Sequence, residues 1–112
     1  MPGLKRTLAR LPGRKILFTN GARAYAELLL IKLGIAHEFS GIFSVEDTGL
    51  SPKPQMRGYR RLLQKFRLNP HRCVMVEDSR VNLLPAKRLG MTTVWLRPGN
   101  RAALEADVAI SQ

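Results

Sequence analysis

Short apolar runs that favour β-strands alternate with helical segments along this chain, and the alternation restricts the folds available to it. The runs are too short for helices, and each is nearly continuous, as in strands that are buried on both faces. The segments between them have apolar residues three or four apart, the spacing of a helix with one buried face. This order predicts an α/β fold with a parallel sheet between two layers of helices. We expect strands at 15–18, 41–45, 73–76 and 92–96, a short fifth candidate at 106–110, and helices at 22–34, 55–68 and 85–90.

Glycine and proline mark the ends of two of these helices. Gly34 directly follows a segment of helical spacing and is a good C-terminal stop, because glycine readily adopts the left-handed conformation found there. Pro85 fits best in the first turn of the last helix, where its missing N–H group removes no hydrogen bond. The last helix is therefore expected to start at Pro85, with residues 77–82 in a loop before it.

The size and composition of the chain fit one domain, residues 1–112, with a single core. Its 112 residues are 45% hydrophobic, and a chain of this length buries roughly two-thirds of its unfolded surface. Cys73 is the single cysteine, and its apolar neighbours indicate a buried thiol in a reducing cytoplasm. The longest apolar stretch is interrupted by charge and too short for a membrane span, and the basic N-terminal residues lack the apolar core of a secretory signal. No membrane partner is expected.

The chain is strongly basic, with a formal net charge of +11 and a pI near 11.1. Such a charge makes nucleic acid a candidate partner. The densest basic run, residues 53–72, carries Met56, Tyr59 and Leu62 at helical spacing with arginine and lysine between them, which is typical of an amphipathic helix. The basic positions are not interleaved with aromatic residues for base stacking. A solvated basic face is therefore favoured over a nucleic-acid groove.

Polar side chains follow the predicted strands at the edge where ligands collect in parallel sheets. Thr19 and Asn20 follow the first strand, and Glu77 and Asp78 follow the third. Lys53 lies between two prolines, which stiffen the backbone around its ammonium group. Mg²⁺ prefers hard oxygen ligands, with one or two carboxylates plus water and phosphate, and a lysine suits a phosphate as a compact positive charge. The set points to phosphoryl transfer or hydrolysis, with Asp78, and Glu77 as a second candidate, holding the metal.

Each of these residues also has a purely structural interpretation. Residues 19–21 are typical of a turn, Lys53 of a surface loop, and residues 77–79 of a helix cap that favours the helix dipole. A second acidic pair, Glu46 and Asp47, is followed by nothing that resembles a metal-binding loop and is interpreted as structural. The hypothesis of a site therefore depends on the order and spacing of the whole set.

Three stretches resemble motifs two, three and four of the haloacid dehalogenase-like (HAD) hydrolase superfamily: "LFTNG", "SPKP" and "VMVEDSRVNLLPAKRLGMTTVWL". The stretches "LPGRKILFTNG" and "LGIAHEFSGIFSVED", with Asn82, are closer to the pyrimidine 5′-nucleotidase-like branch. The resemblance covers residues 8–110. It implies a Rossmann-like three-layer core and Mg²⁺-dependent hydrolysis of a phosphorylated small molecule, of the nucleoside 5′-monophosphate type.

The resemblance also implies roles for the residues at the edge. Thr19 would bind the phosphoryl group, with Asn20 beside it. Lys53 would orient the nucleophile and neutralise phosphate charge. Asp78, with Glu77 as the second choice, would complete the Mg²⁺ shell.

The chain departs from the family pattern at its beginning. Family members start with an Asp-x-Asp motif on the central strand, which supplies the nucleophile and the general acid/base, whereas the first acidic residue here is Glu27. The helical cap that chiefly selects the substrate is missing as well. The chain therefore resembles the C-terminal part of a HAD core, a truncated or split enzyme, expected to be inactive by itself and to bind Mg²⁺ weakly at most.

The absent strand would leave a gap between the first and third strands. The gap measures two interstrand spacings, roughly 9.6 Å, and unpaired backbone groups along it would cost a few kcal/mol for each one buried. Three outcomes follow: the two strands pair directly, a second polypeptide supplies a strand, or the region stays loosely ordered.

Other function classes stay open at this point. One is a non-catalytic module that retains the phosphate-holding edge, and another is a basic nucleic-acid-binding protein, whose affinity would fall steeply with salt. A receiver domain also carries aspartate, threonine and lysine on a parallel sheet, but it needs an acidic pair after its first strand, and residues 15–21 supply none.

Overall fold

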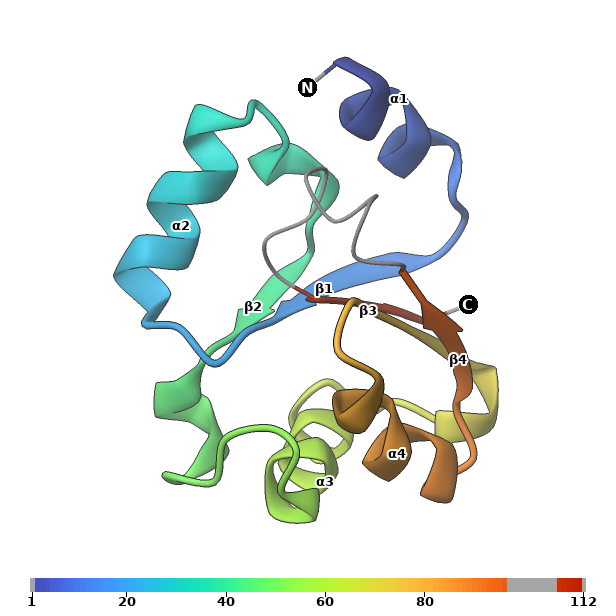
Figure 1. Ribbon diagram of the computed structural model, residues 1–112. Helices are drawn as coiled ribbons and strands as arrows, with labels where there is room; N and C mark the ends of the chain where they lie inside the picture. Colours follow the sequence, from blue (N-terminus) through green and yellow to red (C-terminus); the bar gives the residue numbers. More distant parts are fainter. Residues whose placement is uncertain (1, 97–106, 112) are drawn as a thin grey trace.

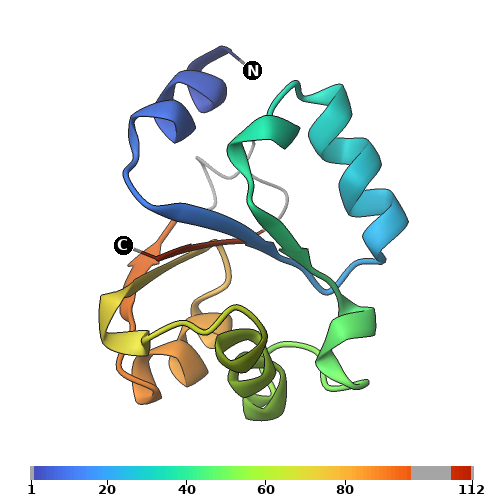
Figure 2. The same ribbon diagram turned by 180° about the vertical axis from the view of Figure 1, so that it is seen from behind.

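Five strands form one sheet in the order β2-β1-β5-β3-β4 in the computed structural model, which describes residues 2–96 and 107–111. Helices α1 and α2 cover one face of the sheet, and α3 and α4 cover the other (Figure 1). The same three layers are visible from behind (Figure 2). The strands are β1 (Arg14–Phe18), β2 (Gly41–Phe43), β3 (Cys73–Glu77), β4 (Thr92–Trp95) and β5 (Asp107–Ser111). The helices are α1 (Pro2–Arg10), α2 (Arg23–Lys32), α3 (Met56–Lys65) and α4 (Arg80–Arg88), with 3₁₀ turns at Ala36–Glu38, Val45–Thr48 and Pro70–Arg72.

The predicted α/β class is confirmed, and four strands pair as a parallel sheet requires. β1 is parallel to β2, and β3 is parallel to β4. The amphipathic helix α3 has the predicted orientation: Tyr59 and Leu62 are fully buried, while Arg57, Arg60 and Arg61 are exposed. None of the helices in the described part of the chain is long and apolar enough to cross a membrane.

The centre of the sheet differs from all three outcomes expected for the gap. β5 lies between β1 and β3 and runs antiparallel to both, with Ala109 paired to Ile16 on one side and to Met75 on the other. Backbone groups on both flanking strands thereby gain partners, and each buried group left unpaired would be costly. A strand from a second polypeptide is not needed to close the sheet, because the fifth candidate of this chain occupies the gap.

The structure also corrects the predicted start of the last helix, α4. The helix begins at Arg80, not at Pro85, and Pro85 lies inside it. Proline in a helix interior removes one backbone hydrogen bond and crowds the preceding turn. Leu83, Pro85 and Ala86 are buried together on the inner side of α4, so packing against the sheet offsets the local cost.

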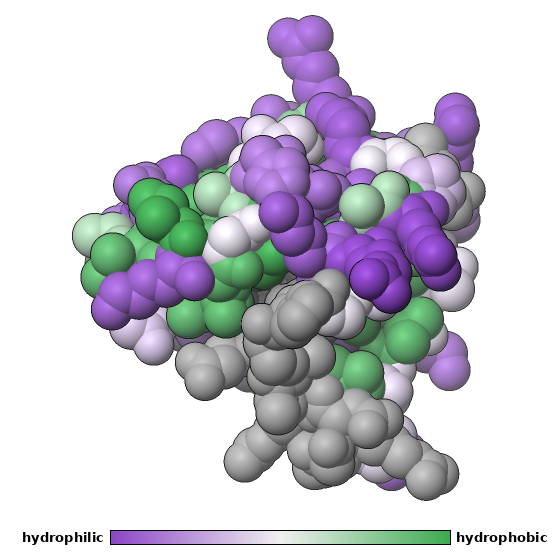
Figure 3. Space-filling model, turned by 90° about the horizontal axis from the view of Figure 1, so that it is seen from above, coloured by the Kyte–Doolittle hydropathy of each residue, from purple (hydrophilic) through white to green (hydrophobic). Residues whose placement is uncertain are grey.

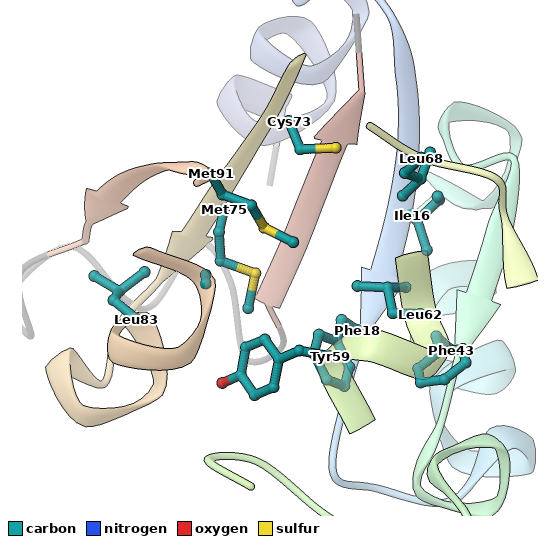
Figure 4. Close-up of a cluster of buried hydrophobic side chains, with 11 residues drawn as sticks. Ile16, Phe18, Phe43, Tyr59, Leu62, Leu68, Cys73, Met75, Leu83 and Met91 are labelled. Atoms are coloured by element: carbon teal, nitrogen blue, oxygen red, sulfur yellow. The ribbon is translucent and has the colours of Figure 1, made fainter. Parts of the chain in front are cut away.

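Two hydrophobic clusters hold the layers together, one on each face of the sheet. Ile16, Phe18 and Met75 face α3, where the rings of Phe18 and Tyr59 meet edge to face with centroids 5.1 Å apart (Figure 4). Leu17, the residue between Ile16 and Phe18, points to the opposite face, as strand geometry requires. There it packs with Leu8, Ala26, Leu30 and Ile35.

Helix α1 contributes Leu8 to the second cluster, although the sequence did not indicate a helix at that position. The side chain of Leu8 is 3% exposed. The thiol of Cys73 is buried, as predicted, and donates to the carbonyl oxygen of Asn69 at 3.2 Å. On the outer side of α2, Tyr25, Leu28 and Ile31 stay exposed, and hydrophobic side chains gather on the face over this helix (Figure 3).

Candidate functional site

A pocket of about 360 Å³ opens at the carboxyl ends of β1 and β3. All five residues singled out in the sequence lie on its wall, because parallel strands end at the same edge of a sheet. They are Thr19, Asn20, Lys53, Glu77 and Asp78. Apolar side chains of Tyr25, Ala26 and Leu29 from α2 form another part of the wall.

Lys53 is the central charge of the pocket. Its side chain is 2% exposed, and its Nζ donates to the backbone oxygen of Phe18 at 3.1 Å and to Oε2 of Glu77 at 3.4 Å. Burial lowers the pKa of the Lys53 ammonium from 10.5 to about 7, and the negative charge of Asp78 opposes part of this shift. A buried ammonium that lies near its pKa at neutral pH gains charge when an anion enters the pocket.

The loop that carries Lys53 is fixed by Asn20. The Asn20 amide accepts from the Lys53 backbone N–H at 2.8 Å and donates to the Lys53 carbonyl at 3.2 Å. The Lys53–Pro54 peptide is cis. Asn20 therefore has a positioning role that the sequence did not indicate, since the two residues are far apart along the chain.

Helix α3 packs closely against the same loop at Gly58. A Cβ atom at this position would lie 2.6 Å from the backbone oxygen of Ser51. The Ser51 N–H in turn donates to the Thr48 hydroxyl at 3.1 Å. Only a glycine lets the helix approach the loop backbone this closely.

Glu77 is an internal partner of the lysine. It is 2% exposed, and its Oε1 accepts from Asn82 Nδ2 at 2.7 Å and from the Ser79 N–H at 3.3 Å. Both carboxylate oxygens are thus engaged with protein donors, since Oε2 faces Lys53. Asn82 is a second supporting residue that reasoning from spacing did not identify.

Asp78 differs from its neighbour. It is partly exposed on the pocket wall, and among the described residues no hydrogen bond to its carboxylate is formed. Its backbone oxygen accepts from Trp95 Nε1 at 3.1 Å, which fixes the main chain at this point. Of the two candidates for a metal ligand, Asp78 is the one whose carboxylate makes no hydrogen bond with the described residues.

Thr19 closes the turn between β1 and α2. Its hydroxyl oxygen accepts from the Gly21 N–H at 2.9 Å, and its own N–H donates to the carbonyl of Phe43 at 3.0 Å. The hydroxyl proton is not used by these two bonds and can be donated to an anion in the pocket. The turn interpretation and the phosphate-binding interpretation of Thr19 are therefore compatible.

Glu46 and Asp47 lie outside this pocket and have structural roles. Asp47 accepts from the backbone N–H and the hydroxyl of Ser44, and it pairs with Arg23 at 2.7 Å and Lys65 at 3.2 Å. Burial raises the pKa of Asp47, but these hydrogen bonds outweigh it and lower the value to about 2. Glu46 accepts from the Arg23 N–H at 3.0 Å.

The donor set fits a hard divalent cation incompletely. Within the described side chains there is no group of three histidine, cysteine or acidic residues able to hold a metal ion. Asp78 offers carboxylate oxygens beside a buried ammonium, and Mg²⁺ bound by one or two carboxylates completes its shell with water and phosphate oxygens. Asp78 would hold the ion, and the ion would supply electrophilic stabilisation to a phosphoryl group.

The fold and this pocket define an α/β protein with polar and charged side chains gathered at the ends of its parallel strands. The family model of the haloacid dehalogenase-like hydrolases matches residues 1–90. The chain belongs to this family.

Two curated relatives and one solved structure agree with this assignment. The chain is 31% identical to validoxylamine A 7′-phosphate phosphatase from Streptomyces hygroscopicus subsp. limoneus, over 82% of this chain and 44% of the relative. It is 33% identical to phosphoglycolate phosphatase from Vibrio cholerae serotype O1, over 88% of this chain and 44% of the relative. A conserved haloacid dehalogenase-like protein of unknown function from Agrobacterium tumefaciens superimposes with a TM-score of 0.73 at 26% identity, over 91% of this chain and 50% of that one. The chain spans about half the length of the curated relatives it matches.

Proposed function

We propose that this edge is part of a Mg²⁺-dependent site for the hydrolysis of phosphate monoesters of small molecules. The observation that carries the proposal is the buried Lys53 ammonium, in one pocket with the Thr19 hydroxyl and the available carboxylate of Asp78. Lys53 and Thr19 would bind the phosphoryl oxygens, and Asp78 would hold the metal. The names of the two curated relatives, both phosphatases of small phosphorylated compounds, support the substrate class.

We propose that the substrate is a nucleoside 5′-monophosphate, as in the pyrimidine 5′-nucleotidase-like branch. The apolar wall made by Tyr25, Ala26 and Leu29 lies beside the polar residues and offers a surface for the organic part of a monoester. A cytoplasmic location stays a prediction from the single buried cysteine, Cys73.

The 112 residues by themselves are proposed to be almost inactive. The covalent nucleophile of the family is an aspartate that precedes everything matched here, and no acidic residue occurs before Glu27. Removal of a covalent nucleophile commonly costs a factor of about 10⁶ in kcat. The pocket in this chain would then bind phosphate without turning over an ester.

Binding of inorganic phosphate, followed by backbone amide shifts in a ¹⁵N spectrum of the full chain, tests the proposal. We expect shifts at Gly21 and Lys53, and their loss in Lys53→Gln and in Thr19→Val. The exposed Lys32→Gln is the matched control that removes the same charge elsewhere. Phosphate shifts that survive both pocket substitutions would contradict the proposed site.

A turnover assay tests the inactivity separately. We expect no hydrolysis of a nucleoside monophosphate above background by the purified chain in Mg²⁺. Turnover that Asp78→Asn abolishes would refute the inactivity while supporting the site.

A further inference from the structure

The outer side of α3 presents a row of guanidinium groups to solvent. Arg57, Arg60 and Arg61 are three and four residues apart, so they lie on one side of the helix, and all three are exposed. Tyr59 and Leu62, on the other side, are fully buried in the core. Among the described side chains of α3, no large hydrophobic one is exposed.

Helix α4 continues this positive charge beside α3. The two helices pack together on the same face of the sheet (Figures 1 and 2). Arg80, Lys87 and Arg88 are exposed on α4, whereas Leu83 and Ala86 are buried on its inner side. The outer sides of the two helices together form a basic surface, which consists of Arg57, Arg60, Arg61, Arg80, Lys87 and Arg88.

The basic surface has little negative charge to balance it. Residues 48–76 and 79–96 contain no aspartate or glutamate. Asp47 pairs with Lys65 at the end of α3, but the cations of the basic surface take part in no ion pair within the described part of the chain. On the opposite face the charges are mixed, since Glu27 and Lys32 are both exposed on α2. A surface of one sign attracts a partner that carries many charges of the other sign.

We propose that the basic surface binds the phosphate backbone of double-stranded DNA without reading the base sequence. Duplex DNA carries one negative charge per about 1.7 Å of its axis. Arg57 and Arg61 are ~6 Å apart along α3, and Arg80 and Lys87 are ~10 Å apart along α4, so the two rows can contact several phosphates at once. Most cations of the surface are arginines, whose planar guanidinium matches the geometry of a phosphate.

Other polyanions fit this surface less well. Single-stranded nucleic acid is bound largely by stacking of its bases on aromatic side chains, and the described helices α3 and α4 expose none. The ring of Trp95 in β4 is already in contact with the Arg80 guanidinium, 5.0 Å from its centroid. A protein partner needs an apolar core in the interface, to which the described residues of α3 and α4 contribute the exposed Val81 and Leu84.

The inference goes beyond the proposed function, because it uses the outer sides of two helices and no residue of the pocket wall. It also goes beyond what the sequence favours. The basic run at 53–72 is by itself typical of a solvated face, and the structure adds a second basic helix beside it.

Fluorescence anisotropy of a labelled DNA duplex of about 20 base pairs measures the binding of the full chain at several salt concentrations. We expect the affinity to fall with salt with a slope of about −4 in a plot of log K against log salt, which corresponds to four or five neutralised phosphates. Two duplexes of unrelated sequence should bind within about twofold of each other. A slope shallower than about −2, or no binding at low salt, would overturn the inference.

A double substitution tests the position of the surface. Arg60→Gln with Lys87→Gln removes one cation from each helix and should weaken binding about tenfold or more, with a slope shallower by about 2. Lys5→Gln with Arg6→Gln removes the same charges from exposed positions of α1 and is the matched control, which should keep the slope of the unaltered chain. Equal effects of the two double variants would show that net charge alone determines binding and would overturn the inference.

Backbone amide shifts in a ¹⁵N spectrum of the unaltered chain locate the duplex directly. We expect shifts at Arg60 and Lys87 and none at Ile31 in α2; shifts confined to α1 and α2 would overturn the inference. If the double variant loses the native amide spectrum, this pattern decides. Tighter binding of a single strand of the same length, or of polyglutamate, would overturn the choice of partner. The phosphate shift expected at Gly21 should persist in the double variant, so failure of the basic surface leaves the proposed function in place.

Discussion

The buried ammonium of Lys53 should make the stability of this protein rise with pH in the mildly alkaline range. Burial lowers the pKa of Lys53 from 10.5 to about 7 in the folded protein. Between these two values the unfolded chain carries a proton on this lysine that the folded chain has released. Stability increases with pH wherever the unfolded state binds more protons. The destabilising effect of burying the charge is thus fully present below pH 7 and disappears as the pH approaches 10.5.

The size of the effect follows from the shift. One pKa unit corresponds to about 1.4 kcal/mol, so the full shift amounts to at most about 5 kcal/mol. Over the interval from about pH 7.5 to 9.5 the gain should be about 2 kcal/mol. The upper limit of the interval is set by Tyr59, because burial raises the pKa of its phenol. Above the unfolded pKa of about 10 the unfolded chain loses the phenol proton while the folded chain keeps it, so stability falls as the pH rises further.

Urea unfolding at several pH values measures the slope, with the fluorescence of the single tryptophan, Trp95, as the signal. Lys53→Met removes the titrating group and should flatten the curve over this interval. Lys53→Met also leaves Glu77 buried without its cation, at a cost of several kcal/mol, so the slopes and not the absolute stabilities are compared. The exposed Lys32→Met should keep the slope of the unaltered chain. Equal slopes in the unaltered chain and Lys53→Met would refute the assignment of a depressed pKa to this lysine.

Two further predictions concern how Lys53 is held. Asn20→Ala removes two hydrogen bonds to the Lys53 backbone, so we expect a loss of about 1–2 kcal/mol in urea unfolding together with weaker phosphate binding; unchanged phosphate affinity would contradict the positioning role. Gly58→Ala forces a Cβ to within 2.6 Å of a loop carbonyl and should destabilise by about 1–3 kcal/mol. Gly3→Ala in α1, where a Cβ meets nothing within 4 Å, is the matched control and should be neutral or stabilising by up to about 1 kcal/mol. Equal effects at the two glycines would show that helix propensity, not the close approach, determines the result.

The parallel strands and the pocket were predictable because the signals for them are local. A buried run such as residues 73–76 can hardly be anything but a strand between two helical segments. Once the strands are parallel, the residues that follow them must share an edge. This geometric rule brings Thr19 and Asp78 together without any knowledge of the side-chain contacts. Lys53 reaches the same edge because its loop returns there from the 3₁₀ turn at Val45–Thr48.

The direction of β5 was not predictable from its own residues. A short apolar strand has the same pattern in either direction, and its place is decided by which backbone groups elsewhere in the sheet lack partners. The prediction of where α4 starts was wrong for a related reason. Local rules place Pro85 in the first turn of a helix, but burial of Leu83, Pro85 and Ala86 on the inner side of α4 extends the helix back to Arg80. The positioning role of Asn20 depends likewise on a contact between segments that are distant in sequence.

Lys53 also contacts the two strands that lie on either side of β5. Its ammonium joins the last carbonyl of β1, at Phe18, to the last side chain of β3, at Glu77. Because one strand lies between them, the ends of β1 and β3 are two interstrand spacings apart, about 9.6 Å. The lysine therefore links the ends of β1 and β3, the two strands that flank β5. The anion-binding role proposed for Lys53 and its contacts with both strands thus use the same buried side chain. A substitution at Lys53 should consequently weaken ligand binding and the central pairing of the sheet together, whereas one at Asp78 should weaken ligand binding alone.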